Sequence, residues 1–290
     1  MSRTGGLRLG LSHDCGHDDG HVADAVEAAL RRLGHDVERL GGGPQLFDAL
    51  RARDPSRRLD GVVNLAGGRG DRRSAAQIPA LLHTLGIPHT GAEPLALALA
   101  LDDGLARSFA AAHGIRTVAD GDEPLLGDEY SIGVLGNGER AAVLCVLCRP
   151  GRPAARSARV FRTVRARADE RLAHARALAV AVHRVFGCHD VSRVELRCDH
   201  DGAPAFVSVD PLPDLRPAGD LARGARRRGW SHDELVRRIL AAAVARWQPS
   251  RPAEPEPPGP TPPSPDHPSR AGARCASPSP TTPTPTSNPI

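Results

Sequence analysis

The sequence contains no lysine: all 38 of its basic residues are arginine, and the formal net charge is +4. A chain without lysine cannot form a Schiff base on a lysine or hold a phosphate with a lysine clamp. An excess of alanine, arginine, glycine and proline is typical of a very GC-rich genome, and that bias alone would produce such a composition. The absence therefore becomes informative only at positions where a particular chemistry requires lysine.

Aromatic residues and long apolar runs are also scarce. Aromatics make up 3% of the chain, which argues against nucleic-acid binding by base stacking. No apolar run approaches the roughly 20 residues that span a bilayer, and residues 1–10 lack the apolar stretch of a signal peptide. We therefore expect a cytoplasmic protein without a nucleic-acid or membrane partner.

The six cysteines are expected to be free thiols because no secretory signal accompanies them. Cys145 and Cys148 have the C-x-x-C spacing, but they lie in an apolar run. Alternation along a strand would send the two thiols to opposite faces. We interpret them as core residues rather than a redox pair.

Residues 1–120 alternate short apolar runs with amphipathic stretches, which predicts a parallel sheet with helices on both faces. Ligands of such sheets collect at the carboxyl ends of the strands, here the loops after Leu11 and Ala66. We expect a Rossmann-like α/β domain with strands at Leu7–Leu11, Val37–Leu40 and Gly61–Ala66 and helices at Ala23–Leu33, Gln45–Ala52 and Ala75–Leu85.

Residues 121–247 have a different order of elements. Two apolar runs separated by Gly136-Asn137-Gly138 predict an antiparallel pair joined by a tight turn. We expect a second, α+β domain with strands at Tyr130–Leu135, Ala141–Leu147, Val191–Cys198 and Ala205–Val209 and helices at Arg171–Phe186 and Asp233–Trp247.

Residues 248–290 differ from both domains in composition. These last 43 residues hold 15 of the 27 prolines, with serine and threonine between them. Proline removes backbone donors, and so little apolar surface cannot offset the entropy of ordering. We expect a disordered tail here.

Three segments carry motifs in a consistent order and spacing. They are Asp60–Asp102 (DGVVNLAGGRGDRRSAAQIPALLHTLGIPHTGAEPLALALALD), Glu123–Gly138 (EPLLGDEYSIGVLGNG) and Val191–Pro217 (VSRVELRCDHDGAPAFVSVDPLPDLRP). Together they resemble the D-alanine–D-alanine ligase branch of the ATP-grasp superfamily. The resemblance implies an N-terminal parallel-sheet (pre-ATP-grasp) domain followed by an α+β ATP-grasp domain.

The resemblance also implies a chemistry. In this family ATP activates a carboxylate as an acyl phosphate, an amine then attacks, and Mg²⁺ ions bridge the phosphates. A small amino acid is the implied substrate, and a homodimer through the N-terminal domain is the implied assembly. Matching positions assign Arg193 as the catalytic arginine, Glu195 and Asp210 as metal ligands, and Asp122, Glu123 and Glu129 as ATP contacts.

The chain also departs from the family pattern. Ser208 stands where the family has a metal-bridging glutamate, and a neutral hydroxyl cannot replace a carboxylate between two cations. Only Val118–Gly121 stands in place of a central subdomain that carries a glycine-rich loop over the ATP phosphates, and the family's phosphate-binding lysines are missing. We therefore expect a truncated ATP-grasp domain with impaired activity.

Two alternatives to an impaired ligase remain open. In the first alternative, the chain is a catalytically inactive pseudoenzyme that keeps the fold in order to bind a partner, with the proline-rich tail as a docking segment. Otherwise it is a decayed or wrongly assembled reading frame without a selected function. Nucleotide binding and amino-acid-dependent phosphate release distinguish the enzyme from the pseudoenzyme.

The segment His13–His21 is rich in His, Cys and Asp, and the family does not explain it. It follows the first predicted strand, where α/β sheets bind ligands, and its residues are typical metal ligands. His17 and His21 would share a helix face, but Gly20 argues against a helix there. A metal site and a flexible polar loop are the two hypotheses for this segment.

Overall fold

The computed structural model describes most of the two predicted domains. It describes residues 6–14, 19–67, 75–118, 127–151, 162–163 and 170–247. The predicted disordered tail, residues 248–290, lies outside them. Contacts between residues group Met1–Pro249 into one compact unit.

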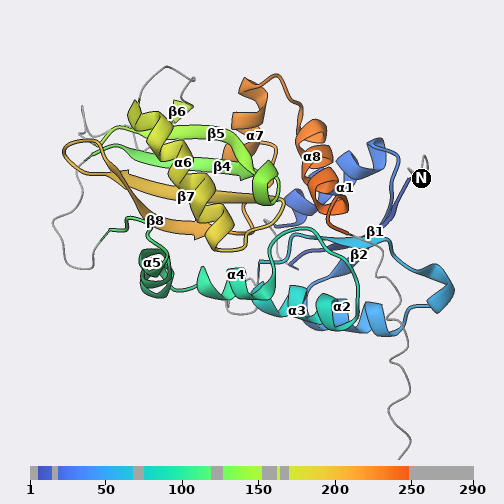
Figure 1. The fold of residues 1–290 in the computed structure, drawn as a ribbon. Helices are drawn as coiled ribbons and strands as arrows, with labels where there is room; N and C mark the ends of the chain where they lie inside the picture. The colour runs from blue at the N-terminus through green and yellow to red at the C-terminus, as the bar shows by residue number, and fades with distance from the viewer. Residues whose placement is uncertain are drawn as a thin grey trace, which may run out of the picture. The chain divides into compact units, whose positions relative to one another are not determined.

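The amino-terminal part builds a parallel sheet with β1 (Arg8–Ser12) at its centre, between β2 (Asp36–Gly41) and β3 (Gly61–Asn64) (Figure 1). Leu9 and Leu11 on one face of β1 and Gly10 and Ser12 on the other are all buried, as expected for a strand covered on both faces. The predicted parallel sheet is therefore confirmed.

Five α-helices belong to the amino-terminal part of the described chain, and the fifth of them, α5, packs on the second sheet. The first, α1, packs its apolar stripe of Val26, Ala29 and Leu30 into the same cluster as β1. It begins four residues earlier than expected and contains Gly20, so the expectation that this glycine would keep the segment out of a helix was wrong. The helices are α1 (Asp19–Arg32), α2 (Gly43–Arg51), α3 (Gln77–Thr84), α4 (Pro94–Leu99) and α5 (Asp103–Ala112).

The second sheet is antiparallel throughout, with the strand order β6-β5-β4-β7-β8. Helix α6 (Glu170–Val185) crosses one of its faces (Figure 1). The helix contributes Leu172, Ala175 and Val182 to the core between itself and the sheet. The α+β prediction is confirmed for this part. The strands are β4 (Glu129–Leu135), β5 (Ala142–Arg149), β6 (Arg162–Thr163), β7 (Val191–Cys198) and β8 (Pro204–Asp210).

The connection between β4 and β5 is longer than the predicted tight turn. Six residues separate the strands, and a short 3₁₀ helix (Gly138–Arg140) lies among them. Asn137 has an extended backbone instead of the left-handed one that an Asn-Gly hairpin turn needs. Its side chain explains the difference, because it hydrogen-bonds to Asp190 and to the Ala242 carbonyl.

The last two helices, α7 (Asp220–Arg227) and α8 (His232–Val244), join the two sheets. Leu235 and Ile239 of α8 share a hydrophobic cluster with β1, α1 and β5. Cys145 also lies in this cluster, whereas Cys148 packs against the cluster under α6, so the two thiols point to opposite faces as predicted. Among the described helices, no apolar stretch is long enough to cross a membrane.

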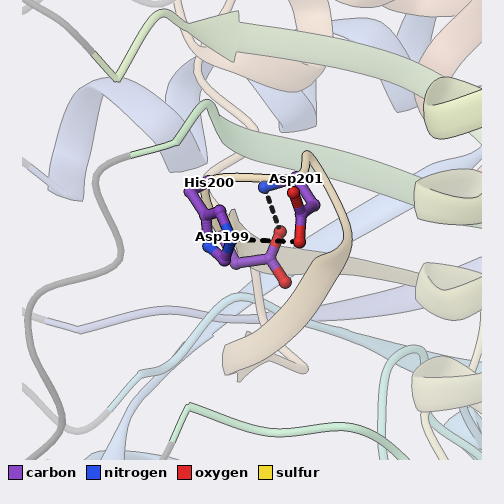
Figure 2. Close-up of side chains that lie close together, drawn as sticks. All are labelled: Asp199, His200 and Asp201. Carbon is purple, nitrogen blue, oxygen red and sulfur yellow. Dashed lines mark hydrogen bonds and ion pairs between the residues drawn. The ribbon is translucent and has the colours of Figure 1, made fainter.

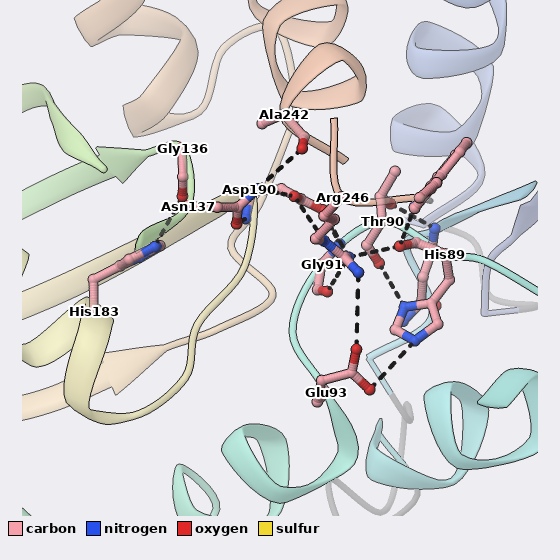
Figure 3. Close-up of polar contacts among 12 residues, drawn as sticks. His89, Thr90, Gly91, Glu93, Gly136, Asn137, His183, Asp190, Ala242 and Arg246 are labelled. Atoms are coloured by element: carbon pink, nitrogen blue, oxygen red, sulfur yellow. Dashed lines mark hydrogen bonds and ion pairs between the residues drawn. The ribbon is translucent and has the colours of Figure 1, made fainter. Parts of the chain in front are cut away.

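A buried ion pair between Asp190 and Arg246 connects these elements (Figure 3). Asp190 is fully buried and has a left-handed backbone, with a φ of 64°. Its carboxylate accepts hydrogen bonds from Gly91 N at 2.8 Å, Asn137 Nδ2 at 2.9 Å and Arg246 Nε at 3.1 Å. Arg246 Nη2 also donates to the carbonyls of His89 and Gly91 at 2.7 and 2.9 Å. We call Asp190, Arg246 and Asn137 the clasp.

A buried histidine, His183, lies beside the clasp. Its Nε2 atom is 3.0 Å from the Gly136 carbonyl oxygen, and its Nδ1 atom is 2.7 Å from Ser192 Oγ. Because a carbonyl only accepts, Nε2 carries the proton of neutral His183, and Nδ1 accepts from the serine. Burial lowers the pKa of His183 to about 4. This histidine is therefore neutral at physiological pH.

Breaking the clasp from one side should destabilise the protein strongly. Arg246→Met leaves the buried Asp190 carboxylate without its cation, and we expect a loss of about 3–5 kcal/mol in the free energy of unfolding. The double variant Asp190→Asn, Arg246→Met should lose less than the sum of the single variants, since asparagine tolerates the left-handed backbone. Urea unfolding followed by circular dichroism measures these values.

The matched control is Arg32→Met, which breaks an ion pair with Asp233 whose arginine side chain is 59% exposed. An exposed pair of this kind contributes about 0–1 kcal/mol. Equal losses for Arg32→Met and Arg246→Met would contradict the role of the clasp.

Acid should destabilise the protein through His183. The pKa of this histidine is about 4 in the folded protein, against about 6.5 in an unfolded chain. Between these values the unfolded state binds more protons, so stability falls as the pH is lowered, by about 3 kcal/mol in total. His183→Gln should reduce the pH dependence of the unfolding free energy between pH 6.5 and 4. The exposed His174 on the same helix supplies the control, and His174→Gln should leave that dependence unchanged.

Candidate functional site

Strand periodicity brings the predicted site residues onto one face of the second sheet. In β7, Val194 and Leu196 are buried in the core under α6, whereas Arg193 and Glu195 alternate with them and remain partly exposed. Directly paired residues of neighbouring strands share a face. The register therefore defines one polar face, made of Glu129, Ser131, Arg149, Arg193, Glu195, Arg197, Ser208 and Asp210.

The two predicted metal ligands lie on either side of the predicted catalytic arginine. Arg193 Nη1 is 3.1 Å from Glu195 Oε1, and Arg193 Nη2 is 3.4 Å from Asp210 Oδ2. Ser208 pairs with Glu195 in the ladder, and its hydroxyl donates to Glu195 Oε2 at 3.2 Å. The structure thus brings Arg193, Glu195 and Asp210 together, with a guanidinium between the carboxylates.

The fourth described site residue, Glu129, lies at the start of β4. Its two carboxylate oxygens each accept a hydrogen bond from an arginine, Arg149 on β5 and Arg197 on β7. Both arginines stand directly opposite Glu129 in the register. The carboxylate is therefore neutralised on both sides.

Two buried polar atoms on this face have no protein partner among the described residues. They are Ser131 Oγ and Arg197 Nε. Ser131 stands directly opposite Glu195 in the register, between the Glu129 and Arg193 groups. Buried polar atoms are normally satisfied by protein, water or a ligand, so this part of the face can accept hydrogen bonds from, or donate them to, a polar group that binds there.

Sequence reasoning missed Arg149, Arg197 and Ser131. Arg197 follows Glu195 by two residues, so strand alternation alone places both on one face. Arg149 and Ser131 depend on which residues of β4, β5 and β7 stand opposite each other, and that register is not contained in the motif spacing. A pairing alignment of the predicted strands was the missing signal.

The remaining predicted residues lie outside the described part of the chain. Asp122 and Glu123 fall there, as do residues 15–18 of the His13–His21 segment. The described ends of that segment show that Asp14 Oδ2 accepts a hydrogen bond from Gly67 N at 2.9 Å. The loops after β1 and β3 therefore meet at the carboxyl ends of the strands, as predicted for a parallel sheet.

Another group of potential metal ligands, Asp199, His200 and Asp201, lies on the turn between β7 and β8 (Figure 2). The Asp199 carboxylate accepts hydrogen bonds from the backbone N–H groups of Ala203 and Asp201 at 2.9 Å and from Arg116 at 2.7 Å. These bonds, first of all the one from Ala203, lower the pKa of Asp199 to about 2. The carboxylate is occupied in forming the turn, so we assign it a structural role.

Comparisons with known proteins find relatives over most of the chain. Residues 122–241 match the family model of the D-ala D-ala ligase C-terminus. The uncharacterized protein y4sG of Sinorhizobium fredii is 24% identical over 79% of this chain and 89% of its own length. The D-alanine–D-alanine ligase of Cupriavidus metallidurans is 25% identical over 80% of this chain and 89% of its own length.

A solved structure supports the same fold. The crystal structure of D-alanine–D-alanine ligase from Bacillus anthracis complexed with ATP superposes with a TM-score of 0.65 at 15% sequence identity. The match covers 82% of this chain and 97% of that one. Fold, family model and similarity over most of the length point the same way. Residues 122–241 thus resemble the C-terminal part of D-alanine–D-alanine ligases, and the chain is similar to such ligases in sequence and in fold over most of its length.

Proposed function

We propose that this chain is a D-alanine–D-alanine ligase-like protein in which ATP- and Mg²⁺-dependent ligation of a carboxylate to an amine is impaired. The observation that carries the proposal is the arrangement around Arg193. Arg193 lies between the carboxylates of Glu195 and Asp210, which by the resemblance would be the catalytic arginine and two metal ligands, and Ser208, opposite Glu195, would stand in place of the bridging glutamate. The truncation of the ATP-grasp domain and its boundary near residue 120 are part of the same proposal.

The described residues fit one magnesium ion better than two. Glu195, Asp210 and the Ser208 hydroxyl offer the hard oxygen ligands that Mg²⁺ prefers. Two bridged ions need a carboxylate between them, and the serine hydroxyl is neutral. When bound, the ion would neutralise negative charge on the phosphates. A bound ion would have to displace Arg193 from both carboxylates, and this competition would lower the affinity of the site for Mg²⁺.

Nucleotide would lie on the same face. Arg149 and Arg197 supply positive charge close to Glu129, and Ser131 Oγ and Arg197 Nε have unused hydrogen-bonding capacity. For Glu129 to bind a ribose, one of its arginines would turn towards the phosphates. Arg193, once released from the two carboxylates, would stabilise the negative charge that develops during phosphoryl transfer. Arginines thus replace the missing lysines in charge but not in geometry.

A specific observation favours the second candidate, an inactive pseudoenzyme. Each carboxylate of the polar face, Glu129, Glu195 and Asp210, already has a guanidinium partner. A face that is neutralised internally is stable without ligand. In this case the fold would serve as a scaffold for a partner.

Nucleotide binding separates the two candidates. For an impaired ligase we expect a fluorescent ATP analogue to bind with sub-millimolar affinity that depends on Mg²⁺, and D-alanine to stimulate slow phosphate release. Arg193→Gln should abolish the release and weaken nucleotide binding much less, because the arginine acts in the transition state. Absence of binding at millimolar nucleotide would reject the ligase and leave the pseudoenzyme.

Restoring the missing carboxylate should restore metal-dependent binding. Ser208→Glu adds a charged ligand beside Glu195, and we expect the Mg²⁺-dependent nucleotide affinity to rise about tenfold or more, which is about 1.4 kcal/mol. Ser208→Gln has the same size without the charge and is the matched control. Equal affinities of the two variants would show that this position does not contribute to a metal site.

A further inference from the structure

A pocket that is lined in part by Asn137 of the clasp lies between the end of β4, the start of β5 and helix α8. Its volume is about 490 Å³, within the range of small-molecule sites. None of its lining residues belongs to the polar face. They are Leu135, Gly136, Asn137, Arg140, Ala142, Val143, Leu144, Arg228, Trp230, Arg237, Arg238, Ala241, Ala242 and Ala245.

Positive charge dominates this pocket. Four of its lining residues are arginines. Two of them, Arg237 and Arg238, form ion pairs with the same carboxylate, that of Glu234, each with an Nε–Oε distance of 2.6 Å. No ion pair joins Arg140 or Arg228 to a carboxylate of the described residues. A local excess of positive charge in a concave site raises the concentration of anions there.

Two of the arginines, Arg228 and Arg238, are held in place by neutral groups. Arg228 donates to the carbonyls of Leu144 and Val143 at 2.6 and 2.7 Å, next to a β-bulge of β5. These carbonyls fix the guanidinium without neutralising it. The guanidinium carbon of Arg238 lies 3.9 Å from the ring centre of Trp230. Such stacking fixes a planar guanidinium, and Arg238 Nε also donates to Glu234 Oε1 at 2.6 Å.

Apolar side chains also line this pocket. Leu135 and Ala142 come from the sheet, Ala241 and Ala242 come from α8, and Ala245 directly follows that helix. The small alanine side chains leave room for a ligand body. A site that combines several cations with apolar side chains suits an amphipathic anion more than an inorganic one.

We propose that this pocket binds a small organic anion with two or more charged groups. Its phosphate or carboxylate oxygens would contact Arg140, Arg228, Arg237 and Arg238, and its carbon skeleton would lie against the alanines of α8. The site is independent of the proposed nucleotide face, because the two share no residue.

The test uses the fluorescent trisulfonate pyranine as the probe and its fluorescence polarisation as the readout, on the full-length chain. We expect saturable binding that weakens with salt and that either pyrophosphate or citrate displaces. Displacement by pyrophosphate alone would identify a phosphate ligand, and displacement by citrate alone a carboxylate ligand. Displacement by neither would overturn the proposal.

Charge reversal locates the site. Arg140→Glu and Arg237→Glu should each weaken pyranine binding about tenfold or more, while the circular dichroism spectrum stays unchanged. Arg51→Glu makes the same change of charge at an exposed position of α2 and should change the affinity less than twofold. Arg193→Gln should also leave binding unchanged. An equal loss in Arg51→Glu, or a loss in Arg193→Gln, would show that the probe binds elsewhere and overturn the proposal.

Discussion

The buried pair of Asp190 and Arg246 holds together four segments that are far apart in the sequence. The segment between α3 and α4, the β4–β5 connection, the start of β7 and the end of α8 all donate to or accept from these two side chains. A carboxylate without exposure to water is tolerated only when its oxygens are fully hydrogen-bonded and its charge is paired. The relative position of the two sheets in residues 1–249 therefore depends on this pair.

The polar face shows the same preference for paired charges in a different setting. Its carboxylates and arginines alternate across four strands, so that every described acid there contacts a guanidinium. In a chain without lysine, the planar fork of arginine makes such bridging common, because one guanidinium can bind two acceptors. The face is thus ordered without a ligand, and anything that binds there has to compete with contacts that already exist.

The alternation of apolar runs was sufficient to predict both sheets and most helices, because burial on one face leaves a period that is readable along the chain. It also placed Arg193 and Glu195 on one side of β7. Glu129 could be named from its motif, but its two arginine partners depend on strand register. The clasp was not predictable, since Asp190, Asn137 and Arg246 follow no local pattern and meet only in the folded chain. Asn137 was misread for the same reason: its side chain is used over a long distance and not in a local turn.

Helix α8 also has a consequence for the order of folding. Its apolar residues complete the cluster that contains Leu9 and Val26, and Arg32 near the start of the chain pairs with Asp233, 201 residues later. During synthesis the first strand and helix therefore remain without their packing partner until almost the whole unit has been made. Such a long separation raises the entropic cost of the contact and slows folding. The nascent chain must keep this apolar surface protected until its last helix arrives.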